Sequence, residues 1–166
     1  DSYYSSEELA AAGILAYSRL GNVTIGNAGD IVGEASGSAA GISASAAGNV
    51  TIDSTNADSL IGAYSNVGYA VGINASANGD VHVASAGDIV AHTNAGFAAA
   101  IYAIGENVDV DNTGSIDAAS ANWAYGIEAI GFDTATASNH GDITATVTSG
   151  QAYGIYASGD NAATVL

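Results

Sequence analysis

Carboxylates are the most abundant ionisable side chains of this 166-residue chain, which has 17 Asp and Glu residues against a single Arg and no Lys. Hard cations such as Ca²⁺ take oxygen ligands, and Asp residues in turns supply them. The densest acidic spot comprises Glu106, Asp109 and Asp111, which are therefore the candidate calcium ligands. Because the chain has neither an EF-hand loop nor a Gly-Gly-x-Gly-x-Asp nonapeptide, we expect calcium to bind loosely at most, and we expect no other cofactor.

Catalytic motifs are absent from the sequence. It has no P-loop, no Gly-x-Ser-x-Gly elbow, no His-Glu-x-x-His and no cysteine. His82, His92 and His140 lie in different contexts, so we expect them to face solvent and not to converge on zinc. The many carboxylates keep a polysaccharide-active enzyme as a third hypothesis, since glycosidases use a pair of carboxyls in a cleft. The leading prediction is that the chain is not an enzyme.

Aromatic side chains give the best indication of a binding surface. Tyr69, Phe97 and Trp123 follow one another at nearly regular intervals, and Tyr102 and Tyr156 each follow an Ile in a recurring motif. Aromatic residues in a row can bind sugars or a protein partner. These five residues are therefore the candidate partner-binding residues, although they could instead stack on each other and stabilise one corner of the fold.

The charge balance excludes two classes of partner. The formal net charge is −16, whereas contacts to nucleic-acid phosphates need Lys and Arg. The same deficit disfavours docking on an anionic membrane surface. Cations and basic partners, in contrast, would be attracted.

A degenerate internal repeat organises the chain from Gly13 onward. Its clearest marker is Gly-Ile-x-Ala, as in Gly13-Ile14-Leu15-Ala16 and Gly72-Ile73-Asn74-Ala75. The marker isoleucines recur every 26 to 31 residues, at Ile14, Ile42, Ile73, Ile101, Ile127 and Ile155. A period in this range is typical of solenoids, in which each repeat buries its apolar face against its neighbours.

Each period contains three short stretches of alternating polarity separated by Gly, Asn, Asp and Ser, which are strand and turn signals. The sequence therefore predicts an all-β fold: a three-sided, right-handed, single-stranded parallel β-helix of about five to six rungs over residues 13–166. Residues 1–12, with a capping-box spacing from Ser5 to Glu8, are predicted to form a short N-terminal capping helix or turn.

Equivalent residues should form columns along such a coil. The second strand repeats Asn22-Val23-Thr24-Ile25, and its fifth copy is aligned as Asp133-Thr134-Ala135-Thr136. The third strand is predicted to bury the column Ile31, Leu60, Ile89, Ile116 and Ile143. The turn before it is predicted to stack Asn27, Asn56, Ser85, Asn112 and Asn139, because stacked Asn side chains can hydrogen-bond one another.

The phrases Ala-Tyr-Gly-Ile-x-Ala (124–129 and 152–157), Gly-Asn-Val-Thr-Ile (21–25 and 48–52) and Gly-Asp-Ile (29–31, 87–89 and 141–143) resemble the passenger-domain repeats of bacterial autotransporter adhesins. The resemblance covers nearly the whole chain from Gly13. It implies a β-helix displayed at the bacterial cell surface. Members of that family carry a C-terminal outer-membrane barrel, which this sequence lacks, so we expect it to be a piece of a longer protein or to use the repeat differently.

These observations favour an extracellular structural or adhesive β-solenoid that is surface-displayed or secreted. Its expected partner is a protein or glycan on a host or neighbouring cell. The alternative is a subunit of an extracellular filament that self-associates head to tail, because the sequence stops at Leu166 within an expected strand and contacts of this kind need not close into a ring.

Overall fold

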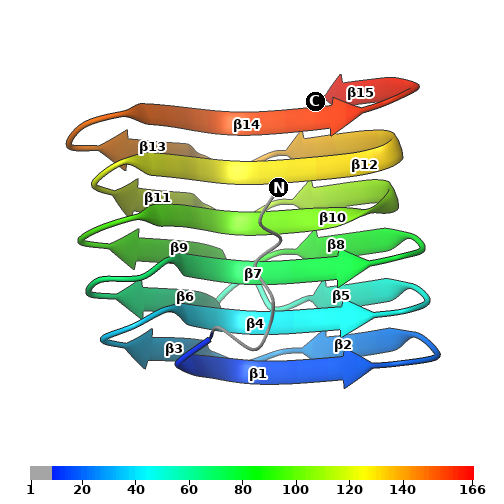
Figure 1. Cartoon of the computed structure of the whole chain (residues 1–166), viewed down its shortest axis with the longest axis horizontal. Helices are drawn as coiled ribbons and strands as arrows, with labels where there is room; N and C mark the ends of the chain where they lie inside the picture. Colours follow the sequence, from blue (N-terminus) through cyan, green and yellow to red (C-terminus); the bar gives the residue numbers. More distant parts are fainter. Residues whose placement is uncertain (1–8) are drawn as a thin grey trace.

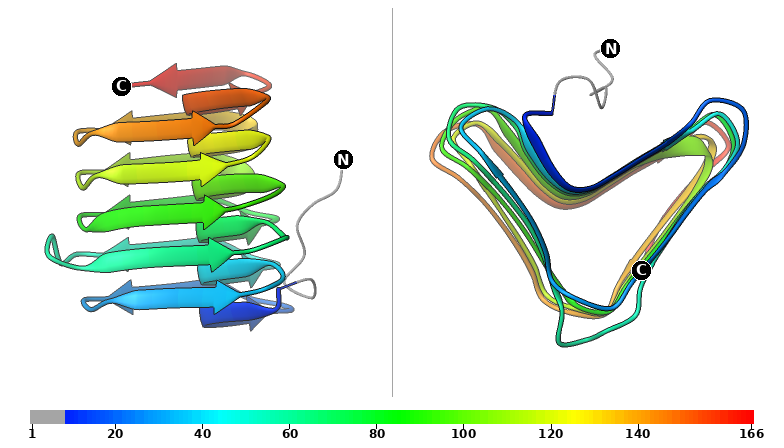
Figure 2. Two further views of the ribbon diagram at one scale, coloured as in Figure 1. Left: turned by 90° about the vertical axis from the view of Figure 1, so that its left-hand side faces the viewer. Right: turned by 90° about the horizontal axis from the view of Figure 1, so that it is seen from below.

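Alternating apolar and polar residues between Gly and Asn turns form three strand segments in each period of the repeat. In the computed structural model, which describes residues 9–166, these periods coil into an all-β parallel solenoid of about six turns of about 28 residues each, with no helix among the described residues. The turns stack along one axis (Figure 1), and their common outline has three sides (Figure 2). The predicted fold class is confirmed.

Each of the three sides takes one parallel strand segment from successive turns. The first two sides form one ten-stranded sheet, because two long strands run through both, and the third side is a separate five-stranded sheet. The first face contains β1 (Ala11–Ser18), β4 (Ala39–Ala46), β7 (Ala70–Ala77), the first halves of β10 (Phe97–Asn112) and β12 (Trp123–Asn139), and β14 (Gln151–Gly159). The second contains β2 (Val23–Asn27), β5 (Val50–Ser54), β8 (Val81–Ser85), the second halves of β10 and β12, and β15 (Ala162–Val165). The third contains β3 (Ile31–Ala35), β6 (Leu60–Ser65), β9 (Asp88–Thr93), β11 (Ile116–Ser120) and β13 (Ile143–Val147).

The predicted N-terminal cap lies mostly outside the described residues. Within the described part, β1 begins at Ala11 and pairs in parallel with β4 through Ala11 and Ala12. The last two residues of the predicted cap are therefore solenoid strand. Among residues 9–166, no helix is long and apolar enough to cross a lipid bilayer.

The marker isoleucines stack in one column in register, from Ile14 to Ile155, which confirms their prediction. The four in the central turns are completely buried, whereas Ile14 and Ile155 in the outer described turns are partly buried. Each fully buried aliphatic side chain contributes about 1.5–3 kcal/mol before entropy is subtracted. This column forms part of the main core.

The third-face column departs from its prediction in one turn. Ile61, and not Leu60, pairs with Ile31 and Ile89 and is fully buried. Side chains alternate with a period of two along a strand, so a shift by one residue exchanges the inward and outward positions. The shift arises in the loop between β5 and β6, the longest turn of the repeat, which projects beyond the outline of the other turns (Figure 2).

The same loop changes the turn column. Ser54, and not Asn56, occupies the position between Asn27 and Ser85, while the Asn56 amide donates to the Ala28 carbonyl from within the loop. The upper part of the column forms as predicted: the Asn112 amide donates to Asn139 Oδ1 at 2.8 Å.

The predicted alignment of the fifth second-strand copy is wrong by one residue. Asn107 pairs with Thr134 and Val108 with Ala135, so Asp133 lies outside the ladder. The cause is a register shift between Gly105 and Asn107, where the β12 turn holds one more residue than the β10 turn. A bulge of this kind leaves the flanking segments paired.

The first face is concave, because its strands bend inward at the middle (Figure 2). At the bend, two consecutive residues point into the core, as Ala100 and Ile101 do in β10. In most turns the first of the two is glycine, and a Cβ there would collide with the third-face isoleucine. At Gly41, for example, it would lie 2.7 Å from Ile61 Cγ2. Glycine therefore lets the first face approach the third.

Candidate functional site

The concave side of the first face carries a cluster of aromatic side chains that is separate from the interior core. Tyr69, Val71, Ala99, Tyr102 and Ile104 form its buried part, with Leu9, Phe97, Tyr125 and Ile130 packed against them. We call this cluster, together with Trp123, Glu128, Tyr153 and Tyr156 on the same side of β12 and β14, the aromatic face. It spans β7, β10, β12 and β14, which are neighbours in the first sheet (Figure 1).

The rings of the aromatic face contact one another from turn to turn. Tyr125 stacks on Tyr153 with a centroid distance of 5.1 Å and an interplanar angle of 17°. Tyr156 meets both rings edge-on, at 6.1 Å from Tyr125 and 6.2 Å from Tyr153. Phe97 lies 5.5 Å from Tyr125 and continues the series downward. Such offset and edge-to-face pairs are the favoured geometries of aromatic rings.

An open groove runs along the edge of this face, where the third face turns into the first. Tyr69, Phe97 and Trp123 line it, as the sequence predicts, and Phe97 pairs directly with Trp123. The groove has a volume of about 610 Å³. Gly96 and Gly150, which also line the groove, have φ of 92° and 110°, values that a residue with a side chain rarely adopts.

Glu128 is an ionisable carboxyl within the aromatic face. It is the register partner of Tyr102 in β10 and of Tyr156 in β14. Its Oε2 atom is buried without a hydrogen-bond partner, although the side chain as a whole is partly exposed. Because burial removes water from the charged form, the pKa of Glu128 rises from 4.5 to about 7.

Asn74 supplies a second acceptor of the same kind. Asn74 in β7 is the register partner of Tyr102 in β10, and therefore lies one turn below Tyr102 in the column that contains Glu128. The side chain of Asn74 is buried, and its Oδ1 atom has no hydrogen-bond partner. Two unsatisfied acceptors thus flank Tyr102, one turn below it and one turn above. Buried polar atoms normally have partners, and leaving one unpaired costs about 1–3 kcal/mol.

The predicted partner-binding residues share this surface but differ in exposure. Trp123 and Tyr156 are 43% and 41% exposed, Phe97 is partly buried, and Tyr69 and Tyr102 are only 9% and 7% exposed. The rings available to a partner therefore gather at the β12 and β14 end of the face. Tyr153, with 36% exposure, joins Trp123 and Tyr156 there.

The candidate calcium ligands lie on the outer side of the second half of β10 and its preceding turn, and all three are exposed. Asp109 Oδ2 is 3.0 Å from His82 Nδ1, and Asp111 Oδ1 is 3.7 Å from His140 Nε2. Over residues 9–166, no three His, Cys, Asp or Glu side chains are grouped so that they could hold a metal ion. The structure does not bring Glu106, Asp109 and Asp111 together as one site.

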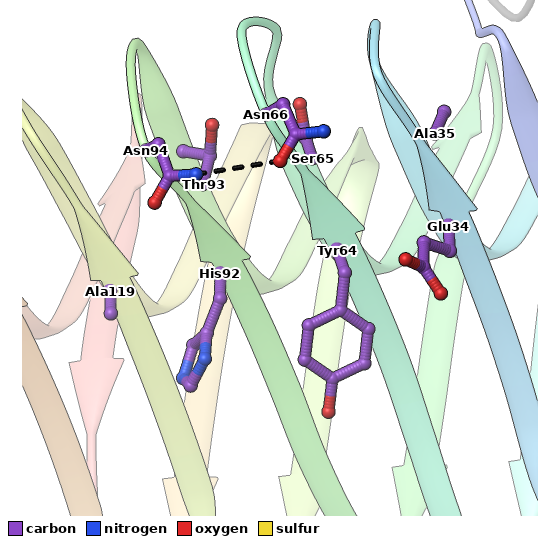
Figure 3. A pocket seen from close by; sticks show the side chains of 9 residues that line it. All are labelled: Glu34, Ala35, Tyr64, Ser65, Asn66, His92, Thr93, Asn94 and Ala119. Carbon is purple, nitrogen blue, oxygen red and sulfur yellow. Dashed lines mark hydrogen bonds between the residues drawn. The ribbon is translucent and has the colours of Figure 1, made fainter.

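The third histidine lies on the third face, in a hollow of about 290 Å³ between β3, β6, β9 and β11 (Figure 3). His92 Nε2 is 2.9 Å from Asp117 Oδ2, and its ring meets Tyr64 edge-on at 5.8 Å. The hydroxyls of Ser65 and Thr93 donate to backbone carbonyls at the strand ends, away from the imidazole (Figure 3). Neither hydroxyl is hydrogen-bonded to His92.

Comparison with known proteins identifies no relative: no protein-family model, no curated protein and no solved structure matches the chain. Its functional chemistry must therefore be argued from the site itself.

Sequence reasoning missed Glu128 as a site residue, and it left Tyr153, an expected outward aromatic, out of the candidate partner-binding set. Glu128 occupies the variable position x of Gly-Ile-x-Ala, and the preceding and following repeats have Tyr102 and Tyr156 at that position. A carboxyl in a column of tyrosines is chemically out of place, and this contrast marks it. Tyr153 was detectable as the equivalent of Tyr125 in the Ala-Tyr-Gly-Ile-x-Ala phrase.

Proposed function

We propose that this chain is an extracellular structural and adhesive rod that binds a surface protein or glycan of another cell through its aromatic face. One observation carries the proposal: exposed Trp123, Tyr153 and Tyr156 lie on a single concave surface, supported from below by further rings. Solvent-exposed aromatic clusters of this kind are typical of interaction sites.

Three further properties support a surface rod over other classes. The strands stack into a coil in which equivalent positions recur in every turn. Outward residues can therefore differ between turns while the buried core residues stay the same. The net charge of −16 favours solubility and disfavours nucleic acid and anionic lipid as partners. The resemblance of the repeat phrases to autotransporter passenger domains favours display at the surface of a bacterium.

The proposal is tested by attachment of coated beads to cells. Beads carrying the chain are compared with beads carrying the double variant Tyr153→Ser, Tyr156→Ser, and with a control variant, Thr144→Ala, Thr146→Ala, which changes exposed residues on the third face. We expect the control to attach as the unchanged chain does, and the tyrosine variant to lose most attachment. Equal attachment of all three, or of uncoated beads, would contradict the proposal.

Self-assembly into filaments is a second proposal. It is favoured by the in-register stacking of identical columns from turn to turn, because the chemistry that joins two turns can also join two copies. Electron microscopy over a range of protein concentrations tests it. Filaments that lengthen with concentration are expected, whereas short particles of one size at every concentration would rule the proposal out.

A further inference from the structure

The aromatic face is rich in hydrogen-bond acceptors and lacks a cationic donor. Glu128 Oε2 and Asn74 Oδ1 are both without partners, and they lie in one column, two turns apart. At about 4.8 Å between strands, this separation is about 10 Å along the axis. The outward positions of β7, β10, β12 and β14 on this face hold no Lys, Arg or His, so nothing in these strands supplies a charged donor.

The surroundings of Glu128 are aromatic. The titratable residues next to it in the flanking strands are Tyr102 in β10 and Tyr156 in β14, with Tyr125 and Tyr153 beside them. No second carboxylate occupies an outward position of these four strands on this face. A carboxyl beside several tyrosine rings is a typical setting for a bound cation, because ring faces attract positive charge.

We propose that Glu128 and the exposed rings of Tyr153 and Tyr156 form a binding site for an arginine side chain of a basic segment of a partner protein. The inference rests on the proposed function and deepens it by naming the chemistry of the partner. Charge complementarity selects this occupant, since a chain with 17 acidic residues and one Arg attracts basic segments from a distance.

Arginine suits this site better than the other donors. Its planar guanidinium presents five N–H donors, stacks on aromatic rings and pairs with a carboxylate at two points. A sugar would also stack on the tyrosines, and its hydroxyls could donate charge-assisted hydrogen bonds to ionised Glu128, but it carries no positive charge to neutralise the carboxylate as a guanidinium does.

The probe is a fluorescent peptide with the sequence Ser-Gly-Arg-Gly-Gly-Arg-Gly-Ser, measured by fluorescence anisotropy at 150 mM salt. A second peptide, in which citrulline replaces both arginines, has the same shape without the charge. We expect the arginine peptide to bind at least tenfold more tightly at pH 8. Its affinity should fall about 30-fold between pH 8 and pH 5.5, because a carboxyl with a pKa of about 7 loses its charge over that range.

Glu128→Gln keeps the shape of the side chain and removes the charge, and Glu34→Gln removes an exposed charge from the third face as a matched control. Glu128→Gln should lose the pH dependence and at least tenfold in affinity at pH 8, while Glu34→Gln binds as the unchanged chain does. Circular dichroism checks that both variants are folded. Equal binding of the two peptides, an affinity that rises as pH falls, or an unaffected Glu128→Gln variant overturns the inference.

The failure of this inference is distinguishable from the failure of the proposed function. If beads attach to cells through Tyr153 and Tyr156 but Glu128→Gln changes neither peptide binding nor attachment, the adhesive function stands and the arginine site is wrong. If the peptide binds through Glu128 and the beads do not attach, the site stands and adhesion to those cells is wrong.

Discussion

Gly72 of β7 lies directly against Ile89 of β9 across the interior, so that a Cβ on this glycine would overlap Ile89 Cγ2. The same relationship recurs in other turns, at Gly13 with Ile31, Gly41 with Ile61 and Gly126 with Ile143. Because the first face is drawn inward along this line, its outer side becomes concave and gathers the aromatic residues. The marker glycine of the repeat thus shapes the binding surface.

Substituting Gly72 by valine tests this role. The new side chain would overlap Ile89 and would also lie close to the Ala100 carbonyl, 2.6 Å from its Cβ, so Gly72→Val should lower the free energy of unfolding by about 1–3 kcal/mol in urea denaturation. Gly26→Val is the matched control, because nothing lies within 4 Å of a Cβ there. Its expected change is within about 0.5 kcal/mol. Equal effects at the two glycines would refute the packing role of Gly72.

The isoleucine column should be as sensitive to truncation as any part of the fold. Ile73 is completely buried between Ile42 and Ile101, so Ile73→Ala should cost about 2–5 kcal/mol through lost burial and a residual cavity. Val67 lies in an exposed turn, and Val67→Ala should leave the unfolding midpoint nearly unchanged. A cost below about 1 kcal/mol for Ile73→Ala would mean that the column is not the core of the solenoid.

Asn112 is expected to stabilise the fold through the hydrogen bonds of its side chain and not through packing. Its buried amide donates to the Gly114 carbonyl at 2.6 Å and to Asn139 Oδ1 at 2.8 Å. Asn112→Ala should therefore lower the free energy of unfolding by about 1–3 kcal/mol. Asn66→Ala, at an exposed position with one long contact to Asn94, should lower it by less than about 0.5 kcal/mol. Thermal melts of the two variants that coincide would show that the hydrogen bonds of Asn112 do not stabilise the fold.

The core could be predicted from the sequence because it depends on local patterns that repeat. Ile14 to Ile155 stack as expected, since each occupies the same place in a recognisable motif. The edge formed by Tyr69, Phe97 and Trp123 follows from the same register. In a solenoid, knowing which residues are equivalent is enough to place them side by side.

Two errors arose where a turn changed length. The β5–β6 loop places Ile61, instead of the predicted Leu60, in the buried column of the third face. The bulge before Thr134 leaves Asp133 outside the strand pairing of β10 with β12. In both cases two neighbouring residues competed for one inward position. The choice depends on the backbone path of the loop, which the apolar pattern alone does not encode.

The burial of Glu128 could not be predicted, because it depends on curvature. On a flat sheet a residue in the variable position of Gly-Ile-x-Ala would face water. The bend at the preceding glycine column turns this side of the sheet into a concave face, where rings from adjacent turns surround the carboxyl. That curvature results from contacts between two faces, which are distant in sequence.

The raised pKa of Glu128 predicts that stability depends on pH. The folded-state value of about 7 exceeds the ordinary value of 4.5, so the folded state binds a proton more tightly than the unfolded state does between these pH values. Stability should therefore fall as pH rises from about 4.5 to 7 and level off above 7. With an allowance for the partial exposure of the side chain, the contribution of Glu128 to this fall is about 2 kcal/mol.

Glu128→Gln isolates this contribution, since the amide is neutral at every pH. Urea denaturation at pH 5 and pH 8 should show that the difference in free energy of unfolding between variant and unchanged chain shifts by about 2 kcal/mol in favour of the variant at pH 8. Glu34→Gln, at an exposed position, controls for the loss of one negative charge and should shift by less than about 0.5 kcal/mol. A Glu128→Gln variant whose relative stability is the same at both pH values would show that the carboxyl is as well solvated in the folded state as in the unfolded chain.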